Sequence, residues 1–162
     1  MVLGFEGKVA WRILAGNAVH VAWGWLMFTG SFFATSAGNL VDVALLPDPL
    51  YTLSLGANAL TLAAFALWYK GGRPLFKREG VAAVAALLMF LGTFLASRYV
   101  VVLFGNPTAL VEVLAGLLTG MGAGTFLLLW GETLVSLGTR ACAVYFAASS
   151  GLAALAHIAL GW

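Results

Sequence analysis

Charged side chains are scarce in this sequence. They make up 9% of its 162 residues, whereas an ordinary soluble domain carries about 25%. Eight basic and six acidic residues are too few to cover a surface that faces water. The same scarcity excludes the basic face with which a soluble domain meets DNA or RNA, so we expect no direct nucleic acid binding by this chain.

Cysteine and the usual catalytic motifs are also rare or missing. A single cysteine, Cys142, excludes an intrachain disulfide. The sequence contains no G-x-S-x-G, no H-E-x-x-H, no phosphate-binding loop and no paired carboxylates on one helix face. We therefore predict that the chain is not an enzyme, and we predict no catalytic residue, metal site or cofactor.

Hydrophobic residues make up 62% of the chain, and the mean hydropathy is +1.01. Five apolar runs reach the length of about 20 residues that a helix needs to cross the hydrocarbon core of a bilayer. All four prolines lie in the gaps between these runs. The sequence therefore predicts an all-α fold, a polytopic helical bundle in the membrane that forms one domain over residues 1–162. The five predicted helices cover residues 13–35, 50–69, 81–104, 109–130 and 141–161.

The gap at residues 70–79 predicts the orientation of the bundle. It holds four basic residues, and short loops rich in Lys and Arg face the cytoplasm. Counting crossings from this gap places Lys8, Arg12 and Arg140 on the same side of the membrane. We therefore expect a multi-pass protein of the inner (cytoplasmic) membrane with a cytoplasmic N-terminus, whose main partner is the lipid bilayer.

Polar side chains inside the apolar runs are costly in lipid, so they usually face the interior of a bundle. Asn17 and His20 lie one turn apart in the first predicted helix. Asn58 is central in the second predicted helix and Thr119 in the fourth. One interpretation is a cavity near the midplane, lined by these four residues, that binds a small-molecule ligand. The other is hydrogen bonding between helices, which is worth about 0.6 kcal/mol per pair in membranes.

Glycine recurs every four residues in the fourth predicted helix, at Gly116, Gly120 and Gly124. This spacing places the three glycines on one face, where a second helix backbone can approach closely. The second helix belongs either to the same chain or to another copy in a homodimer. At the cytoplasmic end of the same helix, we predict that Glu132 forms an ion-pair latch with Arg140 or with the basic gap at residues 70–79.

Two motifs carry a family resemblance. The loop with Gly71, Gly72 and Arg73, followed by a glycine-rich fourth helix, resembles the amino-terminal half of the major facilitator fold. The fourth helix continues from its glycines through three leucines into Trp130-Gly131-Glu132. This pattern is similar to bacterial LuxR-type regulators that carry a twelve-helix, major-facilitator-like membrane region.

The resemblance implies that the chain is the first half of a sensory membrane region that binds a small molecule. Its signal would pass to a DNA-binding domain, which is absent from these 162 residues, as is the second half of the membrane region. One alternative is a half transporter, or a small dimerising transporter, of the major facilitator type. The other is a membrane segment without independent activity.

Overall fold

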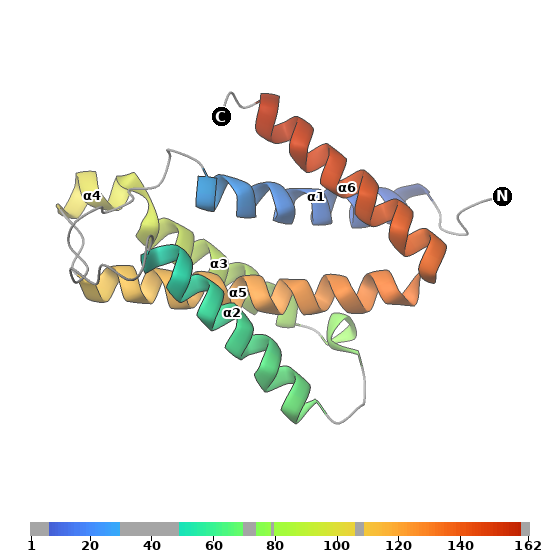
Figure 1. Ribbon diagram of the computed structural model, residues 1–162, viewed down its shortest axis with the longest axis horizontal. Coiled ribbons are helices and arrows are strands. Elements are labelled where there is room, and N and C mark those ends of the chain that lie inside the picture. The colour runs from blue at the N-terminus through green and yellow to red at the C-terminus, as the bar shows by residue number, and fades with distance from the viewer. Residues whose placement is uncertain (1–6, 30–48, 70–73, 79, 106–108, 160–162) are drawn as a thin grey trace. The chain divides into compact units, whose positions relative to one another are not determined.

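The computed structural model contains helices and no strand among the residues that it describes (Figure 1). The predicted all-α class is therefore confirmed for this part of the chain. The described residues are 7–29, 49–69, 74–78, 80–105 and 109–159. The helices are Gly7–Thr29 (α1), Pro49–Trp68 (α2), Val81–Ala96 (α3), Arg98–Phe104 (α4), Ala109–Ser136 (α5) and Thr139–Ala159 (α6), with a 3-10 turn at Leu75–Lys77 (η1).

Two of these helices are long and apolar enough to cross a membrane, Leu50–Trp68 in α2 and Ala109–Ser136, which is α5. At about 1.5 Å per residue, the 28 residues of α5 exceed the roughly 30 Å of a hydrocarbon core. Helix α3 is apolar along its whole length but has only 16 residues. The length and composition of α2 and α5 indicate association with a membrane.

The predicted helix over residues 81–104 is in fact two helices, α3 and α4, separated at Ser97. The backbone of Ser97 is extended, with φ −74° and ψ 151°. Its hydroxyl donates a hydrogen bond of 2.7 Å to the carbonyl oxygen of Phe94. Serine competes in this way for the carbonyls of its own helix, so it favours a helix end. The expectation of one continuous helix over residues 81–104 was therefore wrong.

The other helix bounds differ from the prediction by a few residues. Helix α1 begins at Gly7, ahead of the predicted start at residue 13. Residues 30–35 of the predicted first helix lie outside the described residues. Helix α5 continues past the predicted end at residue 130, and the turn into α6 comes at Gly138, whose φ is +82°. Glycine adopts this left-handed backbone without steric cost, which permits a tight connection there.

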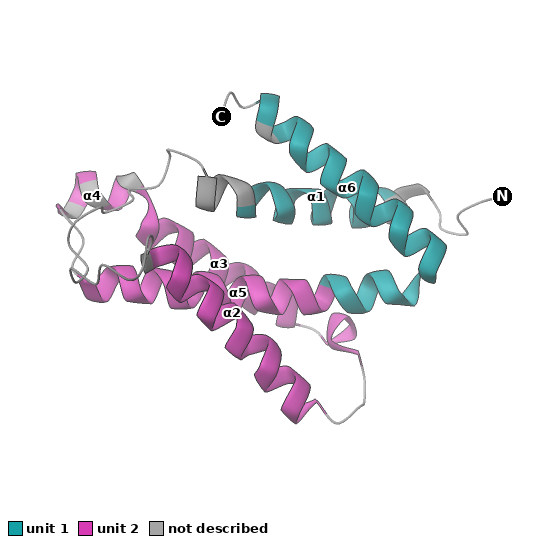
Figure 2. Cartoon of the chain, in the orientation of Figure 1, with its two compact units in different colours: residues 1–31, 130–162 teal, residues 32–129 magenta. Residues whose placement is uncertain are grey.

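The chain divides into two compact units (Figure 2). Unit 1 consists of Met1–Ser31 and Trp130–Trp162, so it brings together helices from both ends of the chain. Within it, α1 packs along α6. Unit 2 is Phe32–Leu129 and holds α2, η1, α3, α4 and most of α5.

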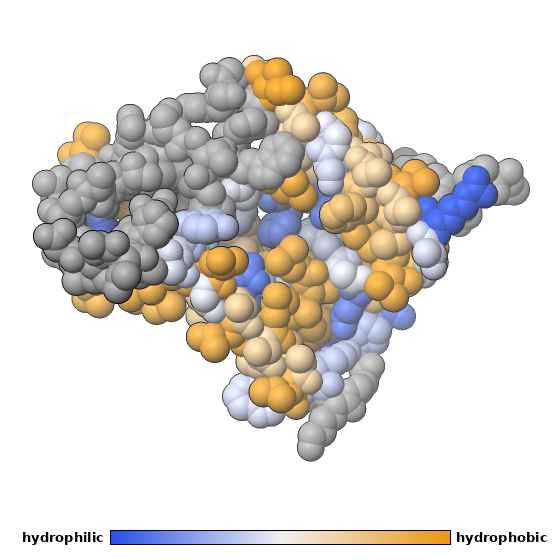
Figure 3. Space-filling view, viewed as in Figure 1, coloured by the Kyte–Doolittle hydropathy of each residue, from blue (hydrophilic) through white to orange (hydrophobic). Residues whose placement is uncertain are grey.

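The most deeply buried side chains of unit 2 are small, and many of its large apolar side chains are exposed. Ala85, Ala115 and Thr119 have no exposed surface. By contrast, Leu60 is 71% exposed and Phe90 is 65% exposed. Hydrophobic residues also cover much of the described surface in Figure 3. A domain that folds in water buries most of its large apolar side chains, so the many exposed ones in unit 2 favour an apolar surrounding.

Candidate functional site

A buried hydrogen bond joins α1 to α6 in unit 1. The side-chain amide of Asn17 donates to the hydroxyl oxygen of Ser149 at 2.6 Å. Asn17 is 5% exposed and Ser149 is fully buried. The Ser149 hydroxyl in turn donates to the carbonyl oxygen of Phe146 at 3.1 Å. Because buried polar groups need partners, this chain of hydrogen bonds fixes the position of Asn17 against α6.

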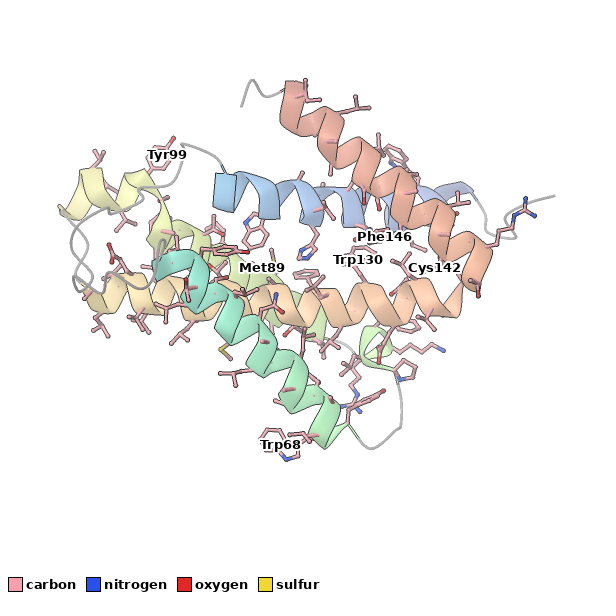
Figure 4. The ribbon with its side chains drawn as sticks, in the orientation of Figure 1. Trp68, Met89, Tyr99, Trp130, Cys142 and Phe146 are labelled. Carbon is pink, nitrogen blue, oxygen red and sulfur yellow. The ribbon has the colours of Figure 1, made fainter. Side chains whose placement is uncertain are left out.

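Trp130 packs against the same turn of α1. A Cβ atom on Gly16 would lie 2.7 Å from Cη2 of the Trp130 ring, so only glycine leaves room for the indole. Figure 4 shows Trp130 reaching from α5 toward α1. The indole Nε1 is buried and has no hydrogen-bond partner within the described residues. It is a donor without an acceptor in the interior of unit 1.

Tyr145 provides a second such donor. Its side chain is 5% exposed, and its hydroxyl has no hydrogen-bond partner in the part of the chain that the structure describes. Tyr145 lies one turn before Ser149 and therefore on the face of α6 that meets α1 at Asn17. Unpaired buried donors are rare in folded proteins and mark positions that a ligand or a water molecule can fill.

His20 follows Asn17 by one turn of α1. Its ring is stacked on that of Trp23, with centroids 6.0 Å apart and an interplanar angle of 19°. The side chain is half-buried. Asn17 and His20, two of the four predicted ligand-binding residues, thus both belong to unit 1.

The other two predicted ligand-binding residues, Asn58 and Thr119, belong to unit 2. A Cβ atom on Gly124 would lie 3.3 Å from the side-chain oxygen of Asn58, which places Asn58 against α5. Thr119 is fully buried against Gly92 of α3. Its hydroxyl has no hydrogen-bond partner among the described residues. The four predicted residues are therefore divided between the two units. Asn58 and Thr119 each contact a neighbouring helix of unit 2.

Gly116, Gly120 and Gly124 of α5 face α2. A Cβ atom on Gly120 would collide with the carbonyl oxygen of Ser54 and lie 2.8 Å from Cβ of Ala57. Cβ atoms on the other two glycines would come within 2.9 Å and 3.1 Å of α2 atoms. This face of α5 is therefore occupied by α2 of the same chain. The sequence analysis had left open whether a helix of the same chain or of a second copy would lie there.

A second close contact, on another face of α5, was missed by the sequence analysis. A Cβ atom on Gly122 would lie 2.6 Å from Cγ of Met89 and 2.9 Å from the carbonyl oxygen of Ala85, both in α3. Gly92 of α3 approaches Thr119 equally closely. The available signal was the pair of small residues beside the four-residue repeat, at Gly122 and Ala123.

The predicted latch residues, Glu132 and Arg140, both lie in unit 1, on either side of the turn at Gly138. Glu132 is half-buried and Arg140 is exposed. Their ion pair stays a prediction. Within the described ranges, no group of three or more His, Cys, Asp and Glu side chains is placed to hold a metal ion.

The sequence analysis also missed Tyr145 as a buried polar residue. Tyrosine near the end of an apolar helix is typical of the membrane interface, so nothing in the sequence marked it as an interior donor.

Searches for related proteins found no matching family model, no matching curated protein and no matching solved structure. The resemblance to LuxR-type regulators and to the major facilitator fold therefore rests on the sequence motifs alone.

Proposed function

We propose that this chain is the ligand-binding membrane part of a sensory protein, embedded in the inner membrane by about five helices with its N-terminus in the cytoplasm. The observation that supports this proposal best is the reversed polarity of the helices. Asn17, Ser149 and Thr119 are buried, whereas many large apolar side chains, such as Leu60, Phe90 and Leu155, are exposed. Lipid suits such an exterior, and polar side chains in a membrane usually face the interior, where they mark functional sites.

The proposed ligand site is the polar interior of unit 1. Trp130 Nε1 and the Tyr145 hydroxyl are buried donors without acceptors in the described residues. They complement a small molecule that offers hydrogen-bond acceptors, such as a carboxylate or a carbonyl compound. Trp130 contacts Gly16, which directly precedes Asn17, and Tyr145 lies one turn before Ser149 in α6. Both donors are therefore close to the hydrogen bond between Asn17 and Ser149. A ligand bound there would therefore influence how α1 packs on α6.

Thermal unfolding of the purified chain in detergent, with a panel of small carboxylates and carbonyl compounds, tests this site. A ligand at 100 times its Kd stabilises the folded state by about 2.7 kcal/mol. Tyr145→Phe removes one donor and keeps the ring, so it should reduce the ligand-induced shift without lowering the stability of the free protein. The control Phe146→Leu changes a neighbouring side chain that is 57% exposed and should keep the full shift. A full shift in Tyr145→Phe contradicts the proposed site.

Single cysteines on a Cys142→Ala background test the proposed topology. Thr139→Cys introduces a thiol at an exposed position beside Arg140, on the proposed cytoplasmic side. Tyr51→Cys introduces one at a position that is 44% exposed, on the proposed outer side. A membrane-impermeant maleimide added to intact cells should label the second variant and leave the first unlabelled until the cells are opened. The reverse labelling pattern would contradict the proposed topology and indicate the opposite orientation.

The resemblance to LuxR-type regulators makes a DNA-binding domain outside this chain the proposed receiver of the signal. Sequencing the native gene past the codon for Trp162 tests this part. A further set of helices followed by a helix-turn-helix supports it. Further helices without such a domain favour the transporter instead, for which movement of the ligand into reconstituted vesicles is the measurement. A stop codon at that point contradicts the regulator and the half transporter, and it leaves the small dimerising transporter.

A further inference from the structure

The segment between α2 and α3 carries the highest density of positive charge in the chain. Residues 70–79 contain four basic residues and one acidic residue, a net charge of +3. The structure describes two of the cations, Lys77 at the end of η1 and Arg78 directly after it. Both side chains are exposed.

The turn η1 holds these cations in a defined place. Leu75, its first residue, is only 4% exposed and anchors the turn in unit 2. The backbone N–H groups of Lys77 and Arg78 donate to the carbonyl oxygens of Pro74 and Leu75, at 3.0 and 2.9 Å. Two adjacent cations therefore project from an anchored turn instead of from a solvated chain.

Each cation also lies near an aromatic ring. Lys77 Nζ is 5.7 Å from the ring centroid of Phe76, and Arg78 Cζ is 5.7 Å from that of Tyr69. Separations within about 6 Å give an attractive cation–π contact. Because Tyr69 directly follows α2, its contact with Arg78 keeps the cation beside the end of that helix.

Exposed apolar side chains also lie at the end of α2 and in η1. Trp68 is 83% exposed, Leu67 is 77% exposed and Phe76 is 39% exposed. Trp68 ends α2, which is one of the two helices apolar enough to cross a membrane, and its ring projects away from that helix (Figure 4). Trp and Tyr at the end of such a helix are typical of the headgroup level of a bilayer.

We propose that Lys77 and Arg78 bind the phosphate headgroup of an anionic phospholipid in the cytoplasmic leaflet, with Phe76 in contact with its glycerol and upper acyl region. Phosphate oxygens accept charge-assisted hydrogen bonds from ammonium and guanidinium groups. This inference rests on the proposed membrane embedding and goes beyond it. A charge that only orients the chain needs no fixed geometry, whereas a headgroup site predicts saturable binding that is specific for anionic lipid.

Thermal unfolding of the full chain in dodecylmaltoside, titrated with phosphatidylglycerol or phosphatidylcholine, tests the site. We expect a saturable rise of Tm with phosphatidylglycerol only. Lys77→Gln/Arg78→Gln removes the charge-assisted hydrogen bonds to the headgroup, so it should raise the midpoint by about tenfold or more. The control Lys8→Gln/Arg12→Gln makes the same charge change near the beginning of α1 and should keep the wild-type midpoint.

One further double variant and one further titration distinguish the outcomes. Lys77→Arg/Arg78→Lys preserves both charges and should keep most of the affinity, which separates loss of the site from loss of the fold. Equal midpoints for the two glutamine variants would overturn the proposal. So would a shift of the same size with inorganic phosphate in phosphatidylcholine micelles, because the site would then belong to free phosphate.

Alkaline carbonate extraction of membranes that carry the same variants tests the embedding separately. Release of the wild-type chain into the soluble fraction would refute the proposed function and, with it, the headgroup site. Retention of the chain, with a phosphatidylglycerol midpoint that does not respond to Lys77→Gln/Arg78→Gln, would refute the headgroup site alone.

Discussion

Units 1 and 2 are held together by different kinds of contact. In unit 1 side chains meet, because Asn17 bonds to Ser149 and the Trp130 ring fills the space over Gly16. In unit 2 backbones meet, because Cβ atoms on five of its helical glycines would come within 3.1 Å of neighbouring helices. These glycines are Gly92, Gly116, Gly120, Gly122 and Gly124. Close packing and interhelical hydrogen bonds are the two main sources of helix association in lipid. Unit 2 should therefore be sensitive to added volume, and unit 1 to the loss of a polar partner.

The largest expected effect is that of added volume in unit 2. Gly120→Ala places a methyl group against the Ser54 carbonyl and the Ala57 side chain, so α2 must move away from α5. We expect a loss of about 2 kcal/mol in the free energy of unfolding, since overpacking costs about 1–3 kcal/mol. Unfolding of the purified chain by SDS in mixed micelles measures this loss.

The matched control is Gly131→Ala on the same helix. No atom lies within 4 Å of a Cβ placed there, so the substitution adds no collision. Alanine is favoured over glycine in a helix by about 1 kcal/mol, so the control should be neutral or stabilising. If the two variants lose stability equally, close backbone contact is not what holds unit 2 together.

The next effect is the loss of a polar partner in unit 1. Asn17→Ala removes the donor, while the Ser149 hydroxyl keeps its own bond to the Phe146 carbonyl. We expect Asn17→Ala to cost about 1 kcal/mol. A double-mutant cycle with Ser149→Ala should give a coupling energy of about 0.6 kcal/mol, with about 1.7 kcal/mol as the upper range in membranes. Additive effects of the two substitutions would show that the hydrogen bond does not form in the membrane.

The same contrast explains what was predictable from the sequence. The face with Gly116, Gly120 and Gly124 is a local pattern on one helix, so periodicity alone revealed it. The sequence could not say which helix occupies that face, because the choice depends on the packing of α2 against α5. Asn17 and Ser149 are 132 positions apart, and no local pattern pairs them.

The helix bounds show the same limit. Hydropathy predicted an apolar run over residues 81–104, and the run exists in the sequence. It did not predict the break at Ser97, because a serine within a long apolar helix can bond to its own backbone with or without ending the helix. Hydropathy therefore locates apolar segments but does not locate the residue at which a helix stops.

The smallest expected effect tests the comparison most directly. Thr119 of unit 2 is buried like Asn17 of unit 1, but its hydroxyl has no partner among the described residues. Thr119→Ala relieves the cost of an unpaired hydroxyl, about 1–3 kcal/mol, and loses a buried methyl group worth about 1 kcal/mol. At the lower end of that range the two terms nearly cancel, so we expect the free energy of unfolding in detergent to change by less than about 1 kcal/mol. Thr119→Ser loses only the methyl group and should be the less stable variant. If Thr119→Ala instead costs more than Asn17→Ala, the hydroxyl has a partner in the membrane, as the predicted ligand cavity requires, and unit 2 then depends on polar contacts as unit 1 does.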